Sequence, residues 1–192
     1  MHAKVIKLDS VESTNIWARK HLAELNDFDV VSADIQSKGH GQFDRKWFSS
    51  SSNGGNIYIS IVLKPDNIEH LNELTRFSAV IISDILEKDY KLEPNFKFPN
   101  DILIDGKKIS GILAESVFLG SEFKGVIVGI GINLNLDEEE LSNIDVPATS
   151  IFNETKKNVQ KDEFLISFME HFENCYDKFL EFGLEQELTY IK

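Results

Sequence analysis

The stretch FKFPNDILIDGKKISGILAESVFL, residues 96–119, decides the fold of this chain. Its Asp105-Gly106 pair lies between alternating apolar residues, and Asp-Gly in that setting is a strong signal for a two-residue hairpin turn. The stretch therefore predicts two antiparallel strands. A further strand is predicted at residues 124–134 (KGVIVGIGINL), where Gly129 and Gly131 interrupt an apolar run.

Outward from this centre, short apolar runs predict more strands, and apolar residues at helical spacing predict helices. The expected strands are residues 3–8, 29–35 and 56–63. The expected helices are residues 13–25, 68–87 and 161–181. Residues 36–55 are rich in Gly, Ser, Asn and charge and predict a long loop, which compact domains seldom keep without a function. We expect one α+β domain over residues 1–192, built on a mainly antiparallel sheet.

Composition excludes several classes of protein. The net charge is −12, and nucleic-acid binders usually carry the opposite sign because phosphate contacts supply much of their affinity. The single cysteine, Cys175, excludes an internal disulfide framework and fits a reducing compartment. No apolar run reaches the roughly 18 residues that a membrane span needs. We therefore expect a cytoplasmic protein that binds neither nucleic acid nor membranes.

The loop contains a glycine-rich segment that fits a small anionic or aromatic ligand. Gly39 and Gly41 let backbone N–H groups approach such a ligand closely. Arg45 can add a charge-assisted contact to phosphate, and Trp47 can pack on an apolar ring. The segment is neither a P-loop nor a dinucleotide fingerprint, since the required Gly-Lys-Ser/Thr ending and third glycine are missing. By itself, a Gly-x-Gly loop is more often a turn than a site.

Polar residues near the predicted hairpin leave two interpretations open. Asn100 and Asp101 follow a proline, which is primarily a turn signal. Lys97 and Lys108 flank that turn, and a lysine among apolar strand residues either extends to solvent or meets an anion. Asn133 ends the strand at 124–134. Its amide fits either a strand-end turn or the edge of a purine, which needs both a donor and an acceptor.

The order and spacing of these motifs are far more specific than any one of them. Glu-Ser-Thr-Asn (12–15), Gln36 with Gly-x-Gly-x-x-x-Arg-x-Trp (39–47), Lys-Phe-Pro-Asn-Asp (97–101), Lys-Ile-Ser-Gly-Ile-Leu (108–113) and Gly-Ile-Gly-Ile-Asn (129–133) together resemble the catalytic domain of biotin–protein ligases. The resemblance covers nearly the whole chain. It implies a central mixed, mainly antiparallel sheet flanked by helices, related to the cores of class II aminoacyl-tRNA synthetases.

The resemblance also implies an activity and its partners. Such an enzyme uses ATP and Mg²⁺ to convert biotin to biotinyl-5′-AMP. It then passes the biotinyl group to a lysine of the biotin carboxyl carrier protein domain of a biotin-dependent carboxylase. Whether the enzyme is a monomer or a homodimer stays open.

The resemblance assigns roles to individual positions. For biotin it implies Ser13, Thr14, Gln36, Gly39, His40, Gly41, Lys108 and Gly111. For the nucleotide it implies Arg45, Trp47, Lys97, Asn100 and Asn133. For catalysis it implies Lys108, Asp101 and Arg45, with Asp101 also the candidate Mg²⁺ ligand.

Several positions depart from the family pattern. Many members have arginines where this loop has His40 and Gln42, a glycine in place of Asp44 and a tryptophan in place of Phe98. We also expect the sequence to lack an N-terminal winged helix, and with it a repressor role, and to lack the small C-terminal β-barrel. Two alternatives therefore stay open: a lipoate–protein ligase or octanoyltransferase relative, and a non-catalytic biotin-binding paralogue.

Overall fold

The computed structural model describes residues 4–41, 46–49 and 54–184. Its strands are β1 (Val5–Val11), β2 (Val30–Gln36), β3 (Asn56–Leu63), β4 (Pro94–Lys97), β5 (Asp101–Ile104), β6 (Lys107–Leu119) and β7 (Glu122–Asn133). Its helices are α1 (Thr14–Lys20), the 3-10 turn η2 (Leu71–Glu73), α2 (Leu74–Tyr90), α3 (Glu138–Leu141), α4 (Ile151–Thr155) and α5 (Lys161–Phe182).

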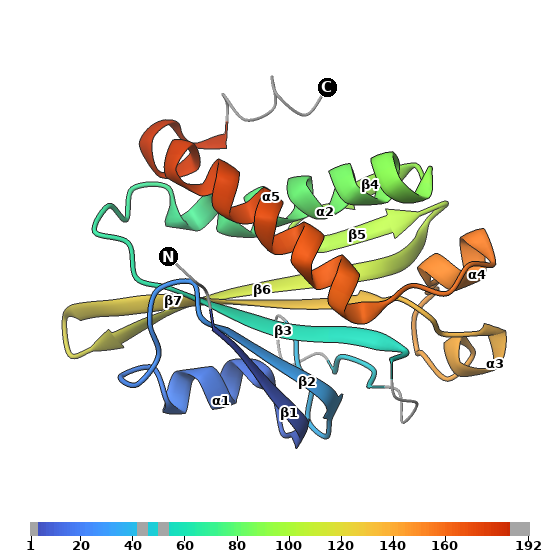
Figure 1. Cartoon of the computed structure of the whole chain (residues 1–192), viewed down its shortest axis with the longest axis horizontal. Helices are drawn as coiled ribbons and strands as arrows, with labels where there is room; N and C mark the ends of the chain where they lie inside the picture. Colours follow the sequence, from blue (N-terminus) through green and yellow to red (C-terminus); the bar gives the residue numbers. More distant parts are fainter. Residues whose placement is uncertain (1–3, 42–45, 50–53, 185–192) are drawn as a thin grey trace.

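The strands form one sheet in the order β1-β2-β3-β7-β6-β5-β4. Among these described strands, β1 and β2 pair in parallel, and every other neighbouring pair is antiparallel. Helices α2 and α5 cover one face of the sheet, and α1 lies against the other (Figure 1). The α+β class and the mixed, mainly antiparallel sheet predicted from the sequence are confirmed.

The predicted hairpin is present, and its turn has the backbone conformation that Asp-Gly favours. Asp105 and Gly106 both have positive φ angles, 47° and 77°, as a tight turn between twisted antiparallel strands requires. The second hairpin strand ends where the predicted stretch ends, and the next strand begins two residues earlier than predicted. β6 continues to Leu119, and β7 begins at Glu122 after a turn in which Gly120 has a φ of 62°.

Other boundaries differ from the prediction for local reasons. Helix α1 ends at Lys20, short of the predicted residue 25. Leu22 and Leu25 lie in the turns that follow the helix, and their side chains are buried. Helix α2 begins at Leu74 rather than at residue 68, because η2 forms the preceding turn. It ends at Tyr90, where Lys91 adopts a left-handed conformation. Strand β4 and the short helices α3 and α4 were not predicted, since segments this short carry little periodicity.

Strand β3 separates two environments because successive side chains point to opposite faces of a sheet. Ile57, Ile59 and Ile61 pack into the larger core with α2 and α5. On the other face, Val62 joins the smaller core beneath α1, while Ser60 makes hydrogen bonds to α1. The α1 face of the sheet therefore becomes polar next to the first turn of α1.

Aromatic packing joins α2 to α5 in the larger core. Phe77 of α2 has its ring centroid 4.3 Å from that of Phe179 and 5.0 Å from that of Phe172. The apolar stripe predicted on the last long helix is buried as expected, at Leu165, Phe168, Phe172, Tyr176 and Phe179. Within the described ranges, no helix combines the length and the apolar character needed to cross a bilayer.

We predict that Phe77→Ala lowers the free energy of unfolding by about 3–5 kcal/mol, because it leaves a cavity between α2 and α5. Chemical denaturation followed by circular dichroism measures this change. Ile166→Ala is the matched control: Ile166 lies on α5 with 58% of its surface exposed. Its truncation should change stability by less than about 0.5 kcal/mol. Equal effects of the two substitutions would contradict this packing.

Candidate functional site

A pocket opens on the α1 face of the sheet, where the central strands carry glycines in place of side chains. Gly111 of β6 and Gly131 of β7 lie directly opposite each other, and Gly129 pairs with Ser60 of β3. The pocket is lined by residues from several segments of the chain: Ser13, Thr14, Asn15, Gln36, His40, Gly41, Trp47, Ile59, Asn100, Lys108, Gly111, Ile112, Leu113, Gly129, Ile130 and Gly131. It brings together nearly all of the biotin positions inferred from the sequence.

The start of α1 and the end of β2 form the neutral polar part of the pocket. Parallel pairing of β1 with β2 places Val11 beside Gln36, so the chain enters α1 next to that glutamine. The Thr14 backbone N–H donates to Gln36 Oε1 at 2.8 Å, and Thr14 Oγ1 lies 3.2 Å from the same oxygen. Ser13, the residue before the first turn of α1, is also buried in the lining.

Asn15 is a pocket residue to which the sequence motifs assigned no role. Its Nδ2 donates to Glu115 Oε2 at 2.7 Å and to the carbonyl of Leu113 at 3.3 Å. Its Oδ1 accepts a hydrogen bond from Ser60 Oγ at 2.5 Å. The amide lies against Gly129, where an added Cβ would come within 2.8 Å of Asn15 Cγ. The only sequence signal for Asn15 is its place in the Glu-Ser-Thr-Asn motif.

The glycine-rich segment folds back so that Trp47 covers part of the pocket. His40 and Lys46 form an antiparallel bridge, and the Trp47 backbone N–H donates to the carbonyl of Gly39 at 2.9 Å. The Trp47 ring lies on the glycine pair: a Cβ at Gly111 would approach Cζ3 to 2.7 Å, and one at Gly131 would approach Cζ2 to 2.6 Å. Arg45, Gln42 and Asp44 lie outside the described residues.

Lys108 lines the pocket, and its positive charge is paired with the carboxylate of Asp101. The Lys108 Nζ lies 2.7 Å from Asp101 Oδ1, an ion pair without the alignment of a hydrogen bond. Both side chains are largely buried, with 22% and 15% exposed. The same Nζ lies 5.0 Å from the centroid of the Trp47 ring, within the range of a cation–π contact. Asn100 is buried beside them and donates through Nδ2 to the carbonyl of Ile112 at 3.2 Å.

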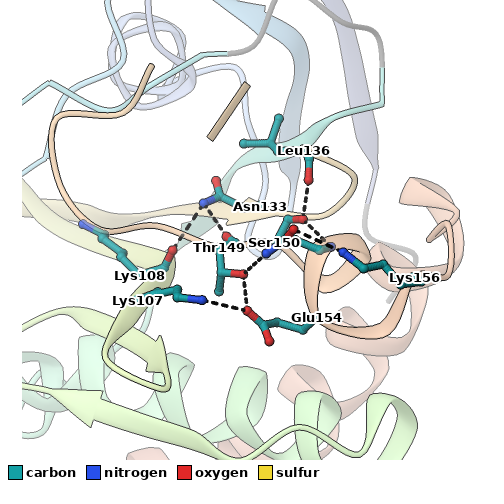
Figure 2. A network of polar contacts seen from close by, with 9 residues as sticks. Lys107, Lys108, Asn133, Leu136, Thr149, Ser150, Glu154 and Lys156 are labelled. Atoms are coloured by element: carbon teal, nitrogen blue, oxygen red, sulfur yellow. Dashed lines mark hydrogen bonds and ion pairs between the residues drawn. The ribbon is translucent and has the colours of Figure 1, made fainter. Parts of the chain in front are cut away.

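The backbone of Lys108 is held by a segment that no sequence motif marked. The Lys108 N–H donates to the carbonyl of Pro147, and the Thr149 N–H donates to the carbonyl of Lys108. Asn133 Nδ2 donates to the carbonyls of Thr149 and Lys108, at 2.9 and 3.4 Å (Figure 2). Residues 147–150 therefore form a strap alongside β6. No hydrophobic periodicity distinguishes this strap in the sequence.

Two positions inferred for the nucleotide lie apart from the pocket lining. Lys97 is exposed at the end of β4. Asn133 is 3% exposed, and its Nδ2 is used in the strap. The roles of both side chains toward a nucleotide stay predictions.

An exposed ion pair lies between the segments that precede α1 and follow β2. Lys38 Nζ is 2.7 Å from Glu12 Oε1. The hydrogen bond from Lys38 holds the pKa of the Glu12 carboxyl below its ordinary value, and the same bond raises the pKa of Lys38. Both groups therefore stay charged over a wider range of pH.

The arrangement can bind a ligand with a neutral polar ring at one end and an anion at the other. Thr14 and Gln36 offer hydrogen bonds to the ring, and Lys108 offers a positive charge to the anion. Among the described residues, no group of three or more His, Cys, Asp or Glu side chains could hold a metal ion.

Comparisons with known proteins match this chain to one family. The model of the biotin/lipoate A/B protein ligase family matches residues 5–133. The bifunctional ligase/repressor BirA of Bacillus spizizenii is 33% identical over 95% of this chain and 57% of its own length. A biotin–acetyl-CoA-carboxylase ligase of Paracoccus denitrificans is 32% identical over 82% of this chain and 67% of its own length.

A solved structure agrees over the whole fold. The biotin protein ligase of Aquifex aeolicus, in complex with biotin and ATP, superposes with a TM-score of 0.82 at 29% identity, over 100% of this chain and 78% of that one. The chain spans little more than half the length of the BirA relative that it matches.

We predict that Gly131→Ala drives the Trp47 ring out of the pocket, because the new methyl group would occupy the space of the indole. The chain has two tryptophans, so a Trp17→Phe background assigns the fluorescence to Trp47. In that background, Gly131→Ala should shift the emission to longer wavelength and increase quenching by acrylamide. If the Gly131→Ala variant kept the same spectrum and the same quenching, the Trp47 ring would not pack on Gly131.

Proposed function

We propose a function for this chain from one premise, that it belongs to the biotin/lipoate A/B protein ligase family. It activates biotin with ATP as biotinyl-5′-AMP and transfers the biotinyl group to a lysine of a carrier protein. One observation carries the proposal: α1, β2, β6 and the glycine-rich segment bring a neutral polar pair and a buried lysine into one pocket. The Aquifex ligase, which matches the whole chain, was solved with biotin and ATP.

At the neutral end of the pocket, Thr14 and Gln36 receive the ureido ring of biotin. The ring carries a C=O between two N–H groups, so it needs donors and acceptors without full charge. Gln36 supplies both, and Ser13 lies beside Thr14 in the lining. The backbone of Gly39, His40 and Gly41 closes over the ring, and Gly111 lets the Trp47 ring and the Lys108 side chain lie against β6 beside the bound biotin.

At the charged end, Lys108 binds the carboxylate of biotin and then the phosphate of the adenylate. In the first step a biotin carboxylate oxygen bonds to the α-phosphorus of ATP, the bond to the β-phosphate oxygen breaks, and pyrophosphate leaves. Two anions must approach each other, so catalysis consists of positioning and charge neutralisation. Lys108 serves both, because its side chain is largely buried and its backbone is held by the strap. Arg45, Trp47, Lys97 and Asn133 are proposed to contact the nucleotide.

Asp101 and Asn100 are proposed to hold Mg²⁺ together with the phosphates. Their oxygens are the hard ligands that Mg²⁺ prefers, and Asp101 Oδ1 is buried without a hydrogen bond. Asn100 Nδ2 is used by the carbonyl of Ile112, which leaves Asn100 Oδ1 as its acceptor end. When bound, Mg²⁺ supplies positive charge that shields the phosphate oxygens. The single carboxylate fits an ion that arrives with ATP rather than a permanent metal centre.

In the second step a lysine of the carrier attacks the mixed anhydride. Its nitrogen bonds to the biotinyl carbonyl carbon, the bond from that carbon to the phosphate oxygen breaks, and AMP leaves. The attacking amine must be neutral, and we assign to Asp101 the role of orienting it or accepting its proton. We propose the biotin carboxyl carrier protein domain of a biotin-dependent carboxylase as the acceptor. Because the reaction consumes ATP, we place the protein in the cytoplasm.

A lipoate substrate is the second candidate, since the matched family includes lipoate ligases. Lipoate has a dithiolane ring, which offers sulfur atoms and no N–H or C=O group. Beneath such a ring the Thr14 hydroxyl oxygen and the Gln36 NH₂ group would gain no hydrogen bond from the ligand, and each missing hydrogen bond is worth about 0.5–1.5 kcal/mol. The hydrogen bonds at the neutral end of the pocket therefore favour biotin.

We predict that the purified protein exchanges labelled pyrophosphate into ATP when biotin is added and does not do so with lipoate. The exchange reports adenylate formation without any carrier protein. Biotin binding measured in parallel separates the outcomes. Binding without exchange would support the non-catalytic alternative, and exchange driven by lipoate would reverse the choice of substrate.

We predict that Lys108→Ala lowers the rate of adenylate formation by roughly 10²–10³-fold, because a charged contact in a buried site stabilises the transition state by about 2–4 kcal/mol. Pyrophosphate exchange measures this loss, and circular dichroism verifies the fold. Lys107→Ala is the matched control, since Lys107 is the neighbouring lysine and its side chain is 49% exposed. Near-normal exchange by the Lys108 variant would make Lys108 a structural residue only.

A further inference from the structure

We propose that Glu115 is a positioning residue that sets the hydrogen-bond polarity of the biotin pocket through Asn15 and Ser60. The inference rests on the proposed function, because the ligand is taken to be biotin. It assigns a role to a carboxylate that lies outside the pocket lining, on β6. The role follows from where each proton in a buried chain of hydrogen bonds must lie.

The first step concerns the orientation of the Asn15 amide. A carboxylate only accepts hydrogen bonds, so the atom that meets Glu115 Oε2 at 2.7 Å must be the NH₂ group of Asn15. The carbonyl of Leu113, at 3.3 Å, demands the same orientation. Arg19 donates to the other oxygen, Glu115 Oε1, at 2.7 Å and holds the carboxylate in place. The carbonyl end of the Asn15 amide is therefore turned toward Ser60.

The second step concerns the single proton of the Ser60 hydroxyl. Ser60 is fully buried, and its Oγ lies 2.5 Å from Asn15 Oδ1 and 2.8 Å from Thr14 Oγ1. Asn15 Oδ1 can only accept, so Ser60 gives its proton to Asn15. At the contact between the two hydroxyls, the proton must then come from Thr14.

The third step concerns what Thr14 and Gln36 present to the ligand. The proton of the Thr14 hydroxyl therefore goes to Ser60 Oγ, 2.8 Å away, rather than to Gln36 Oε1, which lies farther off at 3.2 Å. Thr14 Oγ1 therefore offers the pocket only lone pairs. Gln36 Oε1 is occupied by the Thr14 backbone N–H, which turns the Gln36 NH₂ group toward Gly39. The pocket thus presents an acceptor and a donor side by side, as the N–H and C=O of a cyclic urea require.

Glu115 and Gly129 together make this polarity stable. A bond to a carboxylate is stronger than one to a neutral acceptor, so Glu115 opposes a flip of the Asn15 amide. Gly129 is required because a side chain there would collide with the Asn15 amide, whose Cγ and Nδ2 would both lie 2.8 Å from an added Cβ. Without Glu115, only the longer hydrogen bond to the Leu113 carbonyl opposes a reversal of the Asn15 amide, which would reassign every proton as far as Thr14.

The test is a double-mutant cycle on the affinity for biotin, measured by isothermal titration calorimetry without ATP. Glu115→Ala should weaken binding about tenfold, the scale of one hydrogen bond to a charged group. Glu115→Gln keeps an acceptor oxygen and should restore most of that affinity. In a Thr14→Val background, Glu115→Ala should change the affinity by less than about twofold, because the hydroxyl through which it acts is gone. Glu122→Ala, on the partner strand of the same hairpin, is the matched control and should leave binding unchanged.

The outcomes separate this inference from the proposed function. Equal losses in the two backgrounds, or an unchanged affinity in Glu115→Ala, would overturn the role of Glu115 while wild-type binding of biotin stands. A folded wild-type protein that binds no biotin would overturn the proposed function and this inference with it. Should Glu115→Ala fail to fold, Ser60→Ala replaces it in the cycle, and its effect on biotin affinity should likewise vanish in the Thr14→Val background.

Discussion

The site depends on one constraint: the central antiparallel strands must carry glycines, and so no side chains, on one face and apolar side chains on the other. Alternation along β7 puts Gly129 and Gly131 on the α1 face, while Ile130 between them belongs to the larger core. Gly111 of β6 lies opposite Gly131 of β7, so the area without side chains extends across two strands. Asn15 and Trp47 pack directly on this area. A side chain at any of these glycines would fill space that the pocket contents use.

Charge is distributed along the pocket in a way that suits opposite tasks at its two ends. The neutral end, at Thr14 and Gln36, is the proposed site for the ring of biotin. The other end holds a lysine and a carboxylate 2.7 Å apart, each largely removed from water. Burying both together limits the desolvation cost that either charge would incur alone. A chain with a net charge of −12 thereby holds a lysine in its pocket by pairing it with a carboxylate.

The two ends are supported by different parts of the chain. Lys108 is held through its backbone by residues 147–150 and by Asn133, so its position depends on a strap that follows β7. Thr14 is held through its side chain and its N–H by Ser60 and Gln36. The ring site is therefore tied to β2 and β3, and the charged site to the region beyond β7. Gly111, Gly129 and Gly131 lie on β6 and β7, the strands between these two regions.

Local physics made much of the fold predictable from the amino-acid sequence by itself. Asp105-Gly106 determines its own turn, and the apolar stripe of α5 determines which side of that helix is buried. The motifs around Thr14, Gln36 and Lys108 also indicated pocket positions, through their resemblance to a family. What only the tertiary structure decided is which polar atoms meet. Asn15 contacts Ser60 across 45 residues and Glu115 across 100, and the strap at 147–150 reaches Lys108 without any periodic signal. Such contacts arise from the pairing of strands distant in sequence, and no local pattern of residue types encodes them.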